Sequence, residues 1–492
     1  MIRIKIKTLM LILASMILAL VIAYNGLPSL LFNAGKYEAV LKLFPNDDKA
    51  GMALYYASGE ALQMNDFGED ERLYIFPSFT SSSGRGTMKE ARADAAARLE
   101  QLLHKYSTSK YINGVKINLA RLYMWDGQWD KAEALFRQLS QEPNAFYDVN
   151  ELQSFLKTLE SRHSDPDNHQ KLSISGTVTL GDEPATDVYV ILHRKSDNGW
   201  SSSVNGQYPT AITDERGQYR FYDIAPDDYE LGVGMTPEQV DGYYLTQSEQ
   251  SYATIADDAQ AAPRYDIAFV PQLKVVSPVN KERIDGDRLR FEWEAYPGAD
   301  YYQISITTIA RDKQGNATGS TSSPLLDDRH RTTFAEYRME ELRGSINSYG
   351  KSIDANGFVR LWHSSILGIV YPGGDFIWSV DAYTADGRKL SSSSGYYTML
   401  TYAAPFFTVS EEGMLEGDKL VMENRYEEAI EAYKQDEDKD AALRALARLI
   451  GYGFDDKEGD LDKALRYVDK IVDPSDSDRQ LQAEFRERLQ KE

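Results

Sequence analysis

The chain contains no cysteine among its 492 residues. This absence excludes disulfide bonds, thiolate metal ligands, cysteine nucleophiles and a lipid-modified N-terminal cysteine. Positive charge is also scarce: 54 lysines and arginines stand against 76 aspartates and glutamates, which gives a formal net charge of −22. Nucleic acids and anionic lipids are bound over broad surfaces by positive charge. We therefore expect no nucleic-acid partner and no broad anionic-lipid surface.

The sequence also lacks the motifs that mark common catalytic sites. It has no His-Glu-x-x-His helix, no Gly-x-Ser-x-Gly elbow and no Walker loop. His163 and His169 fall near a predicted linker, where we expect them to be solvated. The acidic run 455–460 lacks the alternation of a calcium loop, which favours a solvated turn. We expect a protein that is not an enzyme, with no catalytic residue, metal or cofactor, although distant carboxylate pairs leave an enzyme on an unfamiliar scaffold open.

The N-terminus predicts export. Arg3, Lys5 and Lys7 precede an apolar run over 9–23. Residues 8–31 reach the roughly 20 residues that a membrane helix needs, so we favour an uncleaved signal anchor over 1–32 with the remainder outside the cytoplasm. The alternative is a signal peptide cleaved after Ala23, which would make the protein secreted. With no cysteine, we favour a Gram-positive cell surface.

Residues 33–163 are predicted to be helical. A recurring block places a large residue, a small one three positions later and a large one four beyond it, as in Trp129-Ala132-Phe136 and Tyr426-Ala429-Tyr433. The small residue allows two helices to approach closely. With Leu119, Ala120, Tyr123 and Gly127, this segment resembles tetratricopeptide repeats, which implies helical hairpins stacked into a protein-binding surface.

Two β modules are predicted in the middle of the chain, after a linker over 164–171. Residues 172–270 alternate apolar and polar side chains. With Thr213-Asp214, Gly217, Tyr219 and Phe221 they resemble a carboxypeptidase regulatory-like (transthyretin-like) β-sandwich, a module that is non-catalytic. Residues 273–408 carry inward Leu289, Phe291, Trp293 and Trp378 and resemble a fibronectin type III-like sandwich.

An insertion near 327–368 lengthens the second module beyond the roughly 100 residues of that fold. It contains a segment over 334–342 that looks helical, together with Tyr349, Trp362 and His363, which look exposed. Two alternatives stay open: a ligand-binding insertion, or an elaborated loop that packs on its own sandwich.

C-terminal helices are predicted over 410–488. They hold two tetratricopeptide-like units, whereas about three make a stable stack. We therefore expect them to pack on another element or to be marginally stable alone. A single solenoid formed with the N-terminal helices is another hypothesis.

The sequence as a whole predicts a multidomain α and β fold in the cell envelope. We expect a membrane-anchored scaffold that binds protein partners through helical repeats, with the β-sandwiches as spacers or secondary binding modules. The alternative is a surface protein that binds carbohydrate or cell-wall polysaccharide. No ligand-binding residue is assigned from the sequence.

Overall fold

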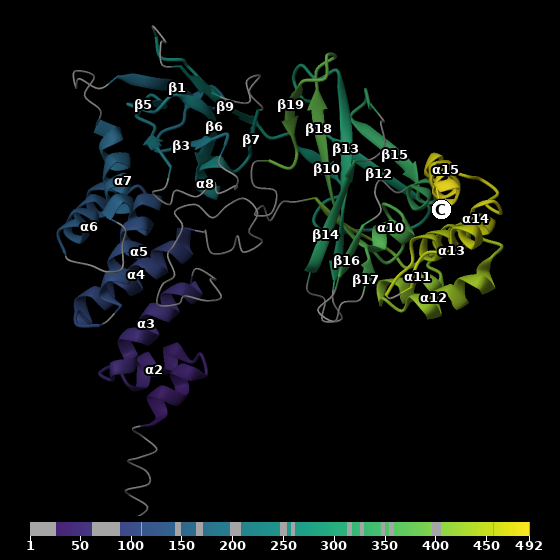
Figure 1. The fold of residues 1–492 in the computed structure, drawn as a ribbon, viewed down its shortest axis with the longest axis horizontal. Coiled ribbons are helices and arrows are strands. Elements are labelled where there is room, and N and C mark those ends of the chain that lie inside the picture. The colour runs from purple at the N-terminus through teal and green to yellow at the C-terminus, as the bar shows by residue number, and fades with distance from the viewer. Residues whose placement is uncertain are drawn as a thin grey trace, which may run out of the picture. The chain divides into compact units, whose positions relative to one another are not determined.

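The computed structural model forms two compact units, one of Met1–Asp241 with Gln247–Phe269 and the other of Gly242–Thr246 with Val270–Glu492. Both units combine helices with antiparallel sheets (Figure 1), so the predicted mixed multidomain fold is confirmed. The structure describes residues 26–61, 89–109, 111–142, 149–163, 171–196, 208–246, 253–256, 261–311, 317–324, 329–345, 350–353, 359–395, 405–455 and 457–491.

The first unit begins with a series of helices in which each packs against the next along the chain. A short helix over 26–33 precedes them. The others are α2 (Tyr37–Leu43), α3 (Asp48–Ala61), α4 (Lys89–Lys105), α5 (Ile112–Trp125), α6 (Trp129–Gln141) and α7 (Val149–Glu160), followed by a 3-10 turn (Ser161–His163).

The hairpin of α5 and α6 shows why these residues form packed helices. Ala120, Ala132 and Phe136 are fully buried between the helices, as their helical spacing predicts. Gly127 ends the turn with a φ of 69°, which a residue without a Cβ adopts readily.

A β-sandwich completes the first unit. Strand β1 pairs with β2, β5 and β9, while β3 lies between β4 and β6, and β6 also pairs with β8. The elements are β1 (Leu172–Leu180), β2 (Glu183–Pro184), β3 (Tyr189–Arg194), β4 (Thr210–Ile212), β5 (Gln218–Tyr222), β6 (Asp227–Gly234), α8 (Pro237–Val240), β8 (Ala253–Ile255) and β9 (Ile267–Pro271).

Strand β3 is buried on both faces, whereas the alternation in its sequence predicts that only one face is buried. Val190 faces the sandwich core and its neighbour Tyr189 is also buried. The Tyr189 hydroxyl donates a hydrogen bond to the carbonyl of Met124 in α5 at 2.8 Å, and its ring lies 5.9 Å from that of Trp129. The helices and the sandwich of this unit therefore share a hydrophobic core.

The second unit contains a two-sheet sandwich. Its sheets run in the orders β10-β12-β15 and β11-β20-β18-β13-β14, with β19 paired to β18. The strands of these sheets are β10 (Val275–Ser277), β11 (Glu282–Ile284), β12 (Arg288–Trp293), β13 (Tyr301–Arg311), β14 (Ala317–Pro324), β15 (Phe334–Arg338), β18 (Asp375–Tyr383), β19 (Lys389–Ser392) and β20 (Phe406–Val409). The unit also contains β7 (Tyr243–Leu245), outside both sheets, and a separate antiparallel pair of β16 (Lys351–Ile353) and β17 (Val359–Leu361).

The core of this sandwich follows the predicted alternation. Phe291 and Trp293 point inward from β12 and Trp378 points inward from β18, all of them buried. The Trp378 indole donates a hydrogen bond to the carbonyl of Pro278 at 2.7 Å, which satisfies its polar group within the apolar core.

The insertion differs from its prediction at 334–342. Residues 334–338 form strand β15 rather than helix, because they pair with β12 along their whole length and bury Ala335. Helix α9 (Met339–Gly344) starts only after that strand, and α10 (His363–Leu367) follows β17. Trp362 is exposed, as expected, whereas Tyr349 lies outside the described residues. The expectation that His363 is exposed is wrong: it is partly buried, because it begins α10, whose other residues are buried.

Five helices end the chain: α11 (Glu416–Met422), α12 (Tyr426–Tyr433), α13 (Asp440–Tyr452), α14 (Leu461–Val468) and α15 (Asp476–Lys491), with a 3-10 turn (Lys434–Asp436). Helix α13 packs against α14 and against α10 of the insertion (Figure 1). It also packs against α9 of the insertion. One hydrophobic core extends from the sandwich through the insertion into these helices. The expectation that the C-terminal helices pack on another element is thus confirmed.

Besides Tyr349, two further predictions fall on residues outside the described ranges. The apolar run over 9–23 is one, and nearly all of the predicted linker over 164–171 is the other. Within the described ranges, no helix has the length and apolar character needed to cross a membrane.

Candidate interaction site

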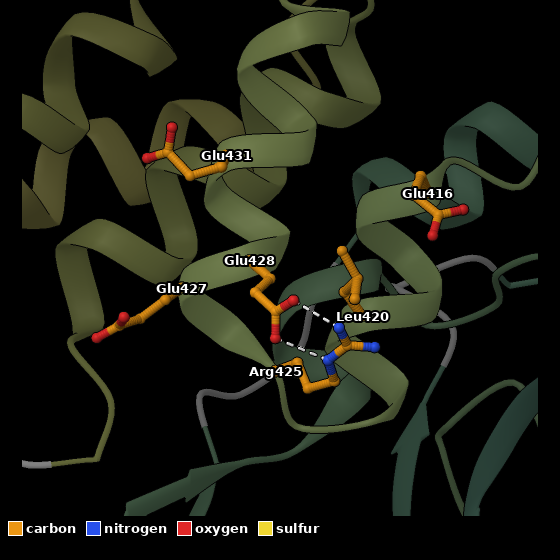
Figure 2. Close-up of a pocket in the computed structure, with 6 residues that line it drawn as sticks. All are labelled: Glu416, Leu420, Arg425, Glu427, Glu428 and Glu431. Carbon is orange, nitrogen blue, oxygen red and sulfur yellow. Dashed lines mark hydrogen bonds and ion pairs between the residues drawn. The ribbon is translucent and has the colours of Figure 1, made fainter.

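A hollow of about 490 Å³ opens beside helices α11 and α12. Glu416 and Leu420 come from α11, Arg425 from the connection, and the remaining lining residues from α12 (Figure 2). Those residues are Glu427, Glu428 and Glu431. Four glutamates against one arginine make the lining strongly acidic.

Arg425 is held by two acidic neighbours. Its guanidinium donates to Glu428 at 2.8 Å and 2.5 Å, as Figure 2 shows, and to Glu423 at 2.8 Å. These hydrogen bonds raise the pKa of Arg425, and the bond from Arg425 lowers the pKa of Glu428. Both groups are therefore charged at neutral pH.

The other acidic side chains of the hollow form ion pairs with lysines that do not line it. Glu431 pairs with Lys434 at 2.5 Å, Glu416 lies 3.9 Å from Lys419, and Glu427 pairs with Lys457. Exposed pairs of this kind stabilise a fold by only about 0–1 kcal/mol. A cationic group of a partner could therefore replace these lysines at little cost to the fold.

The two helices beside the hollow approach each other closely at a glycine. A Cβ added to Gly417 would lie 2.5 Å from the ring of Tyr433, closer than van der Waals contact allows. Tyr433 is fully buried, and its hydroxyl donates to Asp418 at 2.7 Å. Glycine at 417 is thus what allows the tyrosine ring to fix α12 against α11.

Asp418 joins this hairpin to the insertion. One carboxylate oxygen accepts from the backbone N–H of Leu415 at 2.9 Å, which caps the start of α11, and from Arg343 of α9 at 2.8 Å. Burial and the neighbouring Asp418 carboxylate raise the pKa of Tyr433 well above its usual value. The tyrosine therefore stays a neutral donor.

Two arginines of α13 make further links to the insertion. Arg448 donates to the backbone carbonyls of Gly344 and Ile366 at 2.8 Å and 2.9 Å, and burial lowers its pKa to about 10. Arg444 pairs with Asp478 of α15 at 2.9 Å and with Glu340 of α9. The insertion is therefore the base on which the C-terminal helices, and with them the acidic hollow, are positioned.

No residue of this site was assigned from the sequence, although the spacing of three of its glutamates indicates a shared helix face. Glu427, Glu428 and Glu431 follow Tyr426 of the recurring block at positions that share a helix face. The contributions of Glu416 and Arg425 depend on the turn between the helices, which the block does not specify.

The structure places two of the histidines and the acidic run over 455–460. No group of three or more His, Cys, Asp or Glu side chains there is arranged to hold a metal ion. His330 contacts the hydroxyl of Tyr337 at 2.7 Å within the sandwich, and His363 starts α10. In the acidic run predicted as a turn, Asp460 caps α14 by accepting from the backbone N–H of Lys463.

Comparison with known proteins gives no family for this chain. No family model and no curated protein matches it. Among solved structures, a DUF3823 family protein from Parabacteroides merdae ATCC 43184 is 10% identical, with 46% of this chain and 98% of that chain covered and a TM-score of 0.16. BcpA, the major pilin subunit of Bacillus cereus, is 11% identical, with 45% of this chain and 92% of that chain covered and a TM-score of 0.18.

A third similar structure comprises the FN1–FN3 domains of chicken CNTN1, which are 12% identical over 46% of this chain and 65% of that chain, with a TM-score of 0.13. TM-scores this low carry no argument about function.

Proposed function

We propose that this protein is a non-enzymatic, membrane-anchored scaffold outside the cytoplasm, which binds a partner protein of the cell envelope. The helical hairpins act as degenerate tetratricopeptide-like repeats. The two sandwiches, one carboxypeptidase regulatory-like and one fibronectin type III-like, act as spacers or secondary binding modules. The basic and apolar N-terminal sequence supports the anchor.

The repeat assignment is supported by how the hairpins pack. In α5 and α6 the small Ala120 and Ala132 lie at the helix contact, and Gly127 forms the turn. In α11 and α12, Gly417 and Ala429 are the small residues beside Tyr433. Repeats of this kind present exposed helix surfaces to partner segments.

The observation that carries the binding proposal is the acidic hollow beside α11 and α12. It combines an open volume of about 490 Å³ with a rigid base, because the helices are fixed by Tyr433, Asp418 and Arg343. A preformed site loses less entropy on binding than a flexible one. The four glutamates select a partner segment that carries lysine or arginine.

The test is a crosslinked pull-down from intact cells with the full-length protein tagged at its C-terminus. Glu427→Lys combined with Glu431→Lys reverses two charges of the hollow, whose side chains are 68% and 71% exposed. We expect this variant to lose most of the partner that the wild-type protein recovers, because like charges repel a basic segment.

The matched control is Glu484→Lys combined with Glu487→Lys on α15. These side chains also lie in exposed ion pairs and are 51% and 67% exposed. The control should recover the partner as the wild-type does. Equal recovery by both double variants would show that the hollow is not the binding site.

Recovery of wall polysaccharide without a protein partner would favour the carbohydrate-binding alternative instead. Trp293 and Trp378 are buried and so contribute nothing to an aromatic surface for sugars. The exposed Trp362 is the observation that favours this second candidate.

A further inference from the structure

The first described helices expose an unusual number of leucines. Eight large hydrophobic side chains are exposed in the described part of the chain, and three of them, Leu27, Leu30 and Leu43, fall within 17 residues. They are 36%, 66% and 56% exposed. Leu27 and Leu30 are three positions apart on one short helix, so they share a face.

The exposure of these leucines does not come from a poorly packed segment. In the same short helix, Pro28 is buried, and the ring of Phe32 lies 5.3 Å from the rings of both Tyr37 and Tyr56. Val40 and Phe44 bury the inner side of α2. The helices are thus held in place by one side while the leucines remain on the outside.

Charge in this segment differs from that of the whole protein. Residues 26–50 hold three lysines, Lys36, Lys42 and Lys49, against three acids, Glu38, Asp47 and Asp48, for a net charge of zero in a chain of net −22. Glu38 pairs with Arg98 at 2.5 Å, and Asp47 accepts from the backbone N–H of Lys49 at 2.8 Å. Lys36 and Lys42 are exposed.

The position of the leucines in the chain and in the unit bears on what could cover them. Leu27 follows the apolar run over 9–23 by four residues. Within the first unit, α2 lies at the end of the helical series away from the sandwich strands β1 and β3 (Figure 1). Exposed aliphatic side chains beside lysines are the features of a surface that lies in the lipid headgroup region.

We infer that Leu27, Leu30 and Leu43 seat the first helices on the outer surface of the bilayer. This inference rests on the proposed anchor and goes beyond it. The part of the anchor that spans the membrane would then end before residue 26 and not at 31, because the helix over 26–33 packs on the first unit through Phe32. The first unit would meet the membrane with a defined face instead of being free to rotate on a tether, and the sandwich of that unit would point away from the lipid.

The absence of native cysteine makes the test direct. Leu27→Cys, Leu30→Cys and Leu43→Cys are made singly in the full-length chain, labelled with an environment-sensitive fluorophore and reconstituted in phosphatidylcholine vesicles with and without phosphatidylglycerol. Ser140→Cys, at an exposed position of α6, is the matched control. At the three leucine positions we expect the fluorophore emission to shift to the blue and to be quenched by nitroxide-labelled lipids. At position 140 we expect the emission of a probe in water.

The outcomes separate the two proposals. If the protein floats with the vesicles but all three leucine probes report water, the seating is refuted and the anchor stands. If the intact mass corresponds to a chain that begins at Tyr24, and the protein stays in the aqueous fraction, both the seating and the anchor are refuted. A shift at position 140 equal to that at position 30 would also refute a defined membrane face.

Discussion

The guanidinium of Arg343 donates a hydrogen bond to the carboxylate of Asp418 at 2.8 Å, between residues that lie 75 positions apart in the chain. The Asp418 side chain is fully buried and that of Arg343 is 8% exposed. This ion pair connects the insertion of the second sandwich with the hairpin that carries the acidic hollow, so the hollow depends on the insertion for its position.

Removing Asp418 should destabilise the second unit strongly. Asp418→Ala leaves the Arg343 charge buried without its partner, which costs about 3–5 kcal/mol of the free energy of unfolding. Denaturant unfolding monitored by tryptophan fluorescence measures the loss. Glu416→Ala, two positions away in an exposed pair, should change stability by less than about 1 kcal/mol. Similar values for the two variants would contradict the role given to the ion pair.

Gly417→Ala should also destabilise the α11–α12 hairpin. The added methyl would lie 2.5 Å from the Tyr433 ring, so the helices must separate or the ring must move. Overpacking of this size costs about 1–3 kcal/mol. Hydrogen exchange of the α11 and α12 amides should accelerate in this variant more than in Glu416→Ala. Unchanged exchange would show that the helix contact tolerates a Cβ.

His363 should make the stability of the second unit depend on pH. Burial lowers its pKa to about 4, below the value near 6.5 of an unfolded histidine. Between these values the unfolded chain binds more protons than the folded one, so stability decreases as the pH falls from about 6.5 to about 4. We expect a loss of about 1–3 kcal/mol from this residue.

The measurement compares urea unfolding of the wild-type protein and His363→Gln across this pH range. The wild-type should lose more stability than the variant as the pH falls, since glutamine does not titrate. Parallel curves would mean that His363 titrates normally in the folded protein.

The C-terminal helices should not fold alone. Arg444 and Arg448 bond to Glu340 and to the carbonyls of Gly344 and Ile366, all of them in the insertion. A fragment of residues 410–491 lacks these partners, so both arginines would lose their bonds to the insertion. We expect it to unfold without a cooperative transition in circular dichroism, whereas residues 270–492 should unfold cooperatively. A cooperative transition for the shorter fragment would contradict the assigned dependence.

Local periodicity predicted much of the secondary structure and its buried faces. Leu443, Leu446 and Ala447 recur with helical spacing, and all three are buried in α13. Trp293 and Trp378 alternate with polar residues and point into the sandwich. Such patterns involve residues that are close together in the chain within one helix or strand, so they can be recognised from the sequence.

The links between elements were not predictable in this way. Arg343, Arg444 and Arg448 look like solvent-exposed charges in the sequence, but each is buried and bonded to partners far away in the chain. Residues 334–338 appeared helical because their pairing with β12 has no local signal. The acidic hollow was missed for the same reason, since it needs both helices and their connection.

Position-specific photocrosslinking tests the central claim most directly. A photoreactive residue is placed at Glu431, in the hollow, or at Glu487 on α15 as the control, in the full-length protein in intact cells. The account predicts one dominant protein crosslinked from position 431 through a lysine- or arginine-rich segment, and none of it from position 487. Equal crosslinking from both positions, or recovery of wall polysaccharide alone, would contradict it.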